Sequence, residues 1–97
     1  MPRFTISLLA QQEISEVGEY IARENPVRAL SFVRELRVRI GELAERPLAF
    51  HERRDLKPGL RAARHGRYLI FFRFDGQILE VLRVLHGARD LAGIFRD

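Results

Sequence analysis

Residues 67–86, RYLIFFRFDGQILEVLRVLH, contain the pattern that decides the fold. Every second residue from 68 to 74 is apolar, which is typical of a β-strand with one buried face. The dipeptide Asp75-Gly76 favours a tight hairpin turn. Residues 78–86 are apolar on both faces apart from two charged residues, as expected for a strand in the middle of a sheet. We therefore predict an antiparallel hairpin whose second strand is central.

Two helices are predicted before this hairpin. Apolar residues spaced three and four apart over residues 9–24 indicate an amphipathic helix with its glutamates on the outer side. Asn25 is a typical N-cap and Pro26 a typical first helical residue, so a second helix is expected over residues 26–45. Pro47 prevents its continuation. The short connection predicts that the two helices form an antiparallel hairpin.

The apolar stripe of the second helix is broadened by Leu30 and Val33. A stripe of this width has more apolar surface than one neighbour covers. We therefore expect this helix to pack on two neighbours, the sheet and the first helix.

The remaining segments complete one domain. A half-buried strand is predicted over Arg3–Leu8 and a short strand over Leu60–His65, with a loop over residues 47–58 and a short tail over residues 87–97. The order β-α-α-β-β-β predicts a single α+β domain over residues 1–97. Its N-terminal helical hairpin is expected to pack on a four-stranded, mainly antiparallel sheet.

The composition excludes several classes of protein. Of the 97 residues, 46% are hydrophobic, which is too many for a disordered chain. There is no Cys, so disulfide scaffolds, zinc fingers and thiol catalysis are excluded. No apolar run is long enough to span a bilayer, and the first residues lack the apolar segment of a secretory signal. We expect a cytoplasmic protein without membrane contact.

Basic residues are concentrated in the middle of the chain. The formal net charge is +4, and all but one of the 17 basic residues are Arg. Residues 53–73 contain only Asp55 as an acid among their many basic residues, whereas residues 10–24 are mostly acidic. Such a basic region binds phosphate groups or an acidic protein segment, or is a solvated face, and charge alone does not separate these possibilities.

Arg83 lies inside an apolar strand, where an unpaired charge costs free energy. One explanation is a structural salt bridge with Glu80 or with a glutamate of a helix. The other is an arginine that faces an anion, with Arg61 nearby. The sequence leaves both explanations open.

The histidines give little indication of catalysis or metal binding. His86 ends its strand before Gly87, where it could act as a general acid or base or could hydrogen-bond the backbone of the turn, the alternative that we favour. His51 and His65 lack the spacing of metal ligands, so we expect no metal site and no cofactor. Neither a nucleophile motif nor a glycine-rich phosphate loop is present in the sequence.

Residues 82–91, LRVLHGARDL, resemble the RVLHGRRD ending of ParE toxins in the RelE/ParE superfamily. Other stretches of the chain also resemble ParE toxins, and they occur in the same order along nearly the whole chain. Positions within 7–21 resemble the first strand and helix of that family, and positions within 26–47 resemble its second helix. Residues 58–61 and 66–73 resemble its next strands. The resemblance implies a RelE/ParE-like fold.

This resemblance also implies the toxin of a type II toxin–antitoxin system. ParE-type toxins are associated with inhibition of DNA gyrase and are neutralised by a ParD-like antitoxin whose C-terminal part wraps the toxin. Contact with DNA would be made only through the antitoxin. RelE-type toxins instead cut mRNA on the ribosome without a metal, often with a Tyr or another base near the C-terminus. Residues 92–97 contain no such base, which favours a non-enzymatic ParE-type toxin over the RelE-type alternative.

The expected site residues belong to three groups. A ribonuclease would use Arg61, Arg83 and His86. We expect the target, or another anion, to bind Arg61, Arg64, Arg83, His86 and Arg89. We expect the antitoxin to bind Leu30, Val33, Arg37, Arg67 and Arg73.

Overall fold

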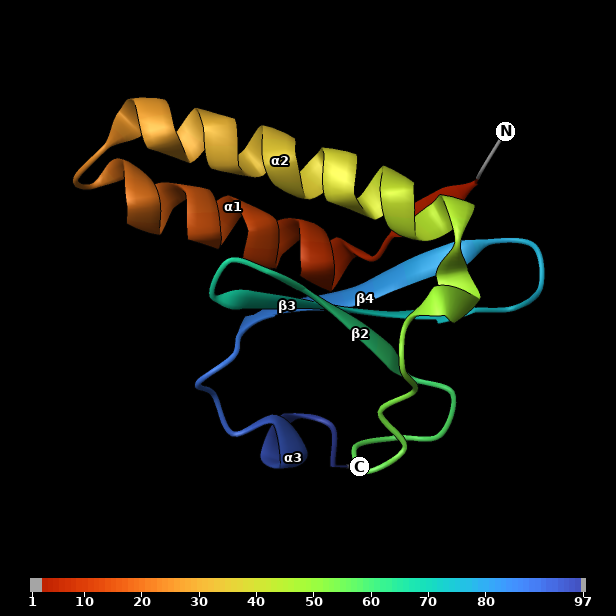
Figure 1. Cartoon of the computed structure of the whole chain (residues 1–97). Helices are drawn as coiled ribbons and strands as arrows, with labels where there is room; N and C mark the ends of the chain where they lie inside the picture. Colours follow the sequence, from red (N-terminus) through yellow and green to blue (C-terminus); the bar gives the residue numbers. More distant parts are fainter. Residues whose placement is uncertain (1–2, 97) are drawn as a thin grey trace.

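Four strands form one sheet in the order β1-β4-β3-β2 (Figure 1). β4 lies between β1 and β3, which confirms that the second strand of the hairpin is central. β1 pairs with β4 in parallel and the other two pairs are antiparallel, so the sheet is mixed. The strands are β1 (Phe4–Ile6), β2 (Arg61–His65), β3 (Tyr68–Phe74) and β4 (Leu79–His86).

The computed structural model describes residues 3–96. Met1, Pro2 and Asp97, which the predicted domain includes, lie outside the described residues. No helix within residues 3–96 is both long and apolar enough to cross a membrane.

A helical hairpin of α1 (Leu8–Ala22) and α2 (Pro26–Glu45) covers one face of the sheet (Figure 1). The side chain of Ser7 accepts a hydrogen bond from the backbone N–H of Ala10 at 3.0 Å and so begins α1. The prediction that the first strand continues to Leu8 is therefore wrong at its end. Leu8 belongs to the helix, because the cap turns the chain one residue earlier.

The start and end of α2 agree with the sequence pattern. The side chain of Asn25 accepts from the backbone N–H of Arg28 at 3.0 Å, and Pro26 is the first helical residue. α2 ends at Glu45 and is followed by a short 3₁₀ helix, η1 (Pro47–Ala49). The predicted caps and bounds of this helix are confirmed.

The main core lies between the helical hairpin and the sheet. α2 contributes three side chains that are fully buried, Leu36, Ile40 and Leu43. Ile70 and Phe72 of β3 meet them from the sheet and are also fully buried. Burial of each such side chain contributes about 1.5–3 kcal/mol, so this layer supplies most of the free energy that holds the hairpin in place.

A second, smaller core lies on the opposite face of the sheet. Leu69 and Phe71 of β3 are buried there, and the Phe95 ring packs on the Phe71 ring with a centroid distance of 4.8 Å. The short tail predicted over residues 87–97 contains a helix that was not predicted, α3 (Leu91–Ile94). The side chain of Asp90 caps this short helix, which covers apolar surface that the helical hairpin cannot reach.

A β-bulge interrupts the pairing of β3 with β4. Phe71 is opposite Arg83, whereas Phe72 is opposite Val81, so Leu82 has no partner on β3. The extra residue lets β4 supply side chains to both cores, with Val81 on the helix side and Leu82 on the α3 side.

The two residues that broaden the stripe of α2 behave differently. Val33 is half-buried against α1, where a Cβ added to Gly18 would lie 3.3 Å from Val33 Cγ2. Leu30 is 64% exposed and remains available to a partner. The expectation that α2 packs on both the sheet and α1 is confirmed.

Candidate functional site

Arg83 is held by a glutamate of α1. Glu13 Oε2 accepts hydrogen bonds from Arg83 Nε at 2.9 Å and from Arg83 Nη2 at 2.6 Å. Glu13 Oε1 accepts from the backbone N–H of Val84 at 2.9 Å. β1 pairs with only the first part of β4, so this carboxylate occupies the sheet edge beyond β1. The structural salt bridge with a helix glutamate is therefore confirmed, while Glu80 pairs with Arg73 instead, at 3.1 Å.

The other arginine of the expected anion pair also has a partner within the chain. Arg61 begins β2, at the sheet edge opposite β1, and its Nη1 donates to the carbonyl oxygen of Phe50 at 2.6 Å. Arg61 and Arg83 are thus engaged by different partners on either side of β3. The geometry does not show them converging on a common anion.

His86 supports the turn that follows β4. Its Nδ1 accepts a hydrogen bond from the backbone N–H of Ala88 at 3.1 Å, which confirms the alternative favoured from the sequence. The neighbouring N–H of Gly87 donates to the carbonyl oxygen of Arg67 at 2.9 Å, so this turn is tied to the turn before β3. The imidazole also packs edge-on against Tyr68, with a centroid distance of 5.4 Å.

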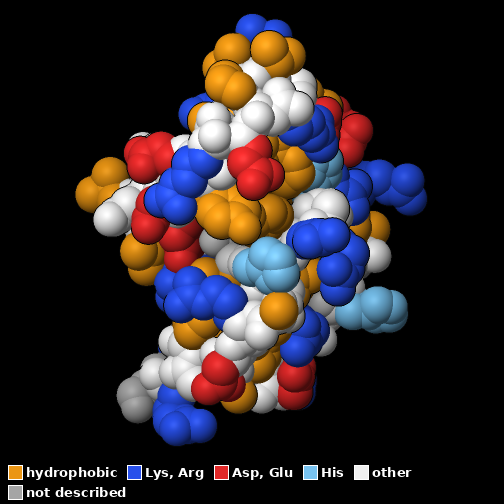
Figure 2. All heavy atoms as spheres, turned by 90° about the vertical axis from the view of Figure 1, so that its left-hand side faces the viewer, with side chains coloured by type: hydrophobic (Ala, Val, Ile, Leu, Met, Phe, Trp, Pro, Cys, Tyr) orange, Lys and Arg blue, Asp and Glu red, His pale blue; other side chains and the backbone are white. Residues whose placement is uncertain are grey.

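Three exposed arginines gather where these two turns meet, and we call this region the arginine end. It comprises Arg64 of β2, Arg67 of the β2–β3 turn and Arg89 after β4. Gly66 has a φ of +60°, a conformation that favours glycine and tightens the turn beside Arg67. Figure 2 shows this end of the molecule, with Lys and Arg side chains around a hydrophobic centre and a histidine side chain beside it.

A hollow of about 540 Å³ opens at the arginine end, between the hairpin and the sheet. Phe32 and Tyr68 form part of its wall and pack edge-on, with a centroid distance of 5.6 Å. Burial raises the pKa of the Tyr68 hydroxyl, nearby Tyr20 raises it further, and Arg67 opposes the shift. Tyr68 is therefore a neutral hydrogen-bond donor at physiological pH.

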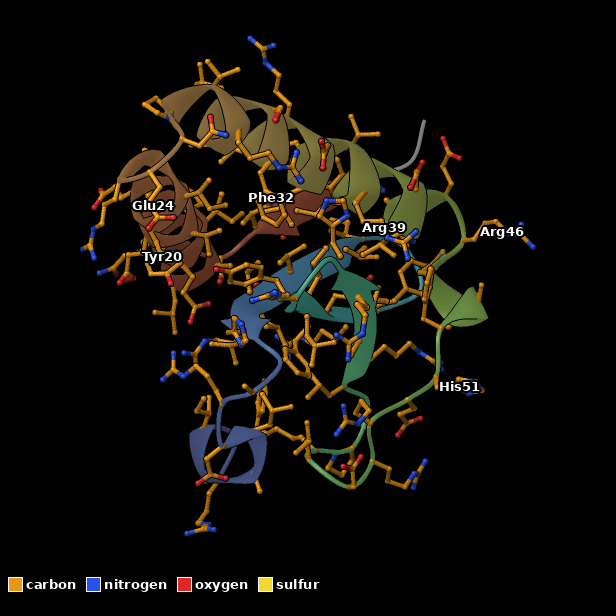
Figure 3. All side chains as sticks on the ribbon, turned by 60° about the vertical axis from the view of Figure 1, so that its left-hand side comes forward. Tyr20, Glu24, Phe32, Arg39, Arg46 and His51 are labelled. Atoms are coloured by element: carbon orange, nitrogen blue, oxygen red, sulfur yellow. The ribbon has the colours of Figure 1, made fainter. Side chains whose placement is uncertain are left out.

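The remaining two histidines differ in their surroundings. His65 lies 3.4 Å from Glu35 and packs against Phe32 with a centroid distance of 5.2 Å. Glu35 also binds Arg28 at 2.7 Å, which lowers the pKa of its carboxyl group. His51 points away from the domain (Figure 3). Within residues 3–96, no three side chains of the metal-binding types come together.

A longer groove of about 960 Å³ runs between α1 and α2, and we call it the hairpin groove. It brings together three of the five residues expected to bind the antitoxin, Leu30, Val33 and Arg37. Arg67 and Arg73 lie elsewhere, because Arg67 is at the arginine end and Arg73 is paired with Glu80 near the hairpin turn.

Small residues line the hairpin groove, and the periodicity of apolar residues does not predict them. Gly18 and Ala22 of α1 face Ala29 of α2 along its walls. Gly18 and Ala22 are one helical turn apart, so they lie on the same side of α1. This spacing was visible in the sequence and could have located the groove.

Two solved structures share this fold. A chain of the chromosomal ParDE toxin–antitoxin system from P. aeruginosa superposes with a TM-score of 0.76 at 18% identity, covering 89% of this chain and 96% of that chain. A chain of the toxin–antitoxin complex RelBE2 from Mycobacterium tuberculosis gives a TM-score of 0.60 at 22% identity, with coverages of 89% and 99%. None of the curated proteins matches this chain in sequence.

The helical hairpin, the mixed sheet and the short C-terminal helix together define a RelE/ParE-like α+β fold. A sequence model of the ParE toxin of the type II toxin–antitoxin system parDE matches residues 4–91, nearly the whole chain. The chain therefore belongs to the ParE toxin family. The resemblance noted in the sequence is confirmed.

Proposed function

We propose that this ParE toxin inhibits DNA gyrase by binding it and does not cleave RNA. The main support for the proposal is the salt bridge between Glu13 and Arg83. Cleavage of RNA without a metal needs an acid, a base and cations that stabilise charge on the phosphate. Glu13 neutralises Arg83, and the Nδ1 atom of His86 is engaged by Ala88, so both candidate groups already serve the fold.

The test measures both activities with the same purified toxin. We expect the toxin to inhibit DNA supercoiling by gyrase and to leave mRNA on translating ribosomes intact. His86→Ala should reduce inhibition only as far as it disturbs the turn at Gly87. Ribosome-dependent cleavage of mRNA by the wild type that disappears in His86→Ala would contradict the proposal and establish the RelE-type alternative.

The target-binding surface that we propose is the arginine end. Arg64 and Arg89 are exposed there beside His86, whereas Arg61 and Arg83 are engaged within the chain. Arg89→Glu should therefore weaken inhibition of gyrase. Arg46→Glu changes the net charge equally at the far end of α2 and should not weaken it. Equal effects of the two variants would remove this surface from the proposal.

We propose further that a ParD-like antitoxin occupies the hairpin groove with an acidic, apolar segment. Both similar structures are toxin–antitoxin assemblies, which supports an antitoxin partner for this chain. Leu30 is largely exposed beside Val33, and Arg37 in the same groove offers a positive charge for an acidic side chain. An amphipathic helix has the shape and the pattern of anchors that such a groove accepts.

The antitoxin proposal is tested by measuring antitoxin affinity for two variants. Leu30→Glu should weaken binding strongly, because it places a charge among apolar contacts. Leu48→Glu alters a residue of η1 that is equally exposed, at 65%, but does not line the groove, and binding should stay unchanged. If neither variant weakens binding, the antitoxin covers another surface.

A further inference from the structure

Three rings form a wall between two adjoining hollows at the arginine end. They belong to Tyr20 of α1, Tyr68 of β3 and His86 of β4, and each ring lines both hollows. The larger hollow has a volume of about 540 Å³ and the smaller about 190 Å³. Tyr20 is 65% exposed and lies on the side of α1 that is turned away from α2 (Figure 3). The Arg23 guanidinium lies over the Tyr20 ring, 6.0 Å from its centroid, and Tyr20 is the most exposed of the three rings.

Positive charge lies on both sides of this wall. Arg67 lines the larger hollow and Arg89 lines the smaller one. Neither guanidinium has an ion-pair partner among residues 3–96, in contrast to Arg28, which is bound by Glu35. Arg64 lies at the same end, because its Nη1 would be 3.8 Å from a Cβ placed on Gly87. It also has no ion-pair partner among residues 3–96 and adds a third positive charge.

The acidic groups nearby do not cancel this charge. Glu13 lines the smaller hollow, but Arg83 already neutralises it through two hydrogen bonds. Glu16 also lines that hollow and is exposed. Two further exposed carboxylates are near, Glu24 beside Tyr20 (Figure 3) and Asp90, whose Oδ1 accepts from the N–H of Gly93. Together with Arg23 over the Tyr20 ring, four arginines face three exposed carboxylates, which leaves this end with a small positive excess. In Figure 2, Lys and Arg side chains border the hydrophobic centre on several sides, with Asp and Glu side chains among them.

Aromatic rings between arginines fit one class of ligand well. Guanidinium groups bind phosphates through paired hydrogen bonds, and exposed aromatic rings stack on nucleic-acid bases. An amphipathic protein helix fits the hairpin groove better, because that groove is larger, with about 960 Å³ against about 540 Å³. Duplex DNA would not expose the faces of its bases to a ring. The chemistry therefore selects a strand with unpaired bases.

We propose that the arginine end binds a nucleic-acid strand directly, with one unpaired base stacked on Tyr20 and flanking phosphates bound by Arg67 and Arg89. This departs from the expectation that the toxin contacts DNA only through its antitoxin. It deepens the proposed function and rests on it, because DNA opened by the target would supply such a strand.

The test measures binding of fluorescent single-stranded oligonucleotides, as DNA and as RNA, to the full-length toxin without gyrase. Tyr20→Ala should weaken binding by roughly tenfold, the typical loss of one stacked base. Arg67→Gln should weaken binding at low salt and reduce the slope of log Kd against log salt by about 0.7. Leu48→Ala and Arg46→Gln are matched controls in exposure and charge, and neither should have these effects.

Several results would overturn the inference. These are equal effects of the variants and their controls, duplex DNA that binds as tightly as the single strand, or polyglutamate that competes as well as the oligonucleotide. DNA that binds more tightly than RNA would support a DNA strand as the ligand, and the reverse would overturn that part of the inference.

Gyrase inhibition, assayed separately, distinguishes the two proposals. Inhibition without strand binding overturns this inference alone, and strand binding without inhibition overturns the gyrase proposal alone.

Discussion

Glu13 is the residue on which the arrangement of β4 depends most directly. One carboxylate pairs with Arg83, a partner 70 positions away, and also accepts the N–H of Val84. Glu13 is 8% exposed, so its carboxylate is largely shielded from water. A buried ion pair of this kind contributes little when intact but is costly to break, since the remaining charge keeps no partner.

We expect Glu13→Ala to lower the free energy of unfolding by about 3 kcal/mol, because it leaves Arg83 and the Val84 N–H without partners. Glu13→Gln should cost less, since its amide oxygen still accepts from Val84. Urea denaturation measures both changes. Glu35→Ala is the control, as it removes an exposed ion pair with Arg28 and should have only a small effect. Equal losses in the two Glu13 variants would contradict this account.

The β3–β4 hairpin is closed by the side chain of Asp75. Its Oδ1 accepts from the backbone N–H groups of Gln77 and Ile78, each at 2.8 Å. These two hydrogen bonds favour the charged carboxylate and lower the pKa of Asp75 below its ordinary value of 3.8. A lowered pKa stabilises the folded state above the ordinary value, and this contribution is lost as the pH falls through the folded-state pKa.

Asp75→Ala should therefore destabilise the protein at neutral pH, and the difference from the wild type should shrink as the pH falls below 3.8. Unfolding by urea at a series of pH values measures this difference. Asp75→Asn should show an intermediate loss at neutral pH, because it keeps an acceptor oxygen without the charge. A difference that stays constant down to acidic pH would show that the carboxylate charge does not stabilise the turn.

Across the whole molecule, the sheet has apolar side chains on both faces and requires two covers. The helical hairpin covers one face, and α3 together with Leu56 and Leu60 of the segment before β2 covers the other (Figure 1). The second cover is small, so single contacts within it carry much of its stability. Phe95 is one of these contacts, through its ring packing on Phe71.

Phe95→Ala should lower the free energy of unfolding by about 2 kcal/mol, less than for a fully buried Phe, and should increase binding of a hydrophobic dye. Arg96→Ala, at the exposed neighbouring position, is the control and should change neither quantity. Unchanged stability in Phe95→Ala would show that α3 does not contribute to the core.

Several features of the fold were determined by the sequence alone. The alternation over residues 68–74, the turn at Asp75-Gly76 and the caps of α2 all depend on residues close together in the chain. Local backbone preferences and the period of apolar residues are enough to predict such elements. The motif over residues 82–91 indicated the ParE family for the same reason, because a contiguous stretch of sequence can be compared directly with the sequences of a family.

Only the tertiary structure decided which of these residues act together. Glu13 meets Arg83 because α1 packs beside the part of β4 that β1 leaves unpaired. Likewise, Tyr20 joins Tyr68 and His86 in one wall although each lies on a different element, while Leu30 stays exposed despite its place in an apolar stripe. These outcomes depend on packing between elements distant in the sequence. No local pattern specifies such packing, because the partner of a side chain is fixed only when the layers assemble.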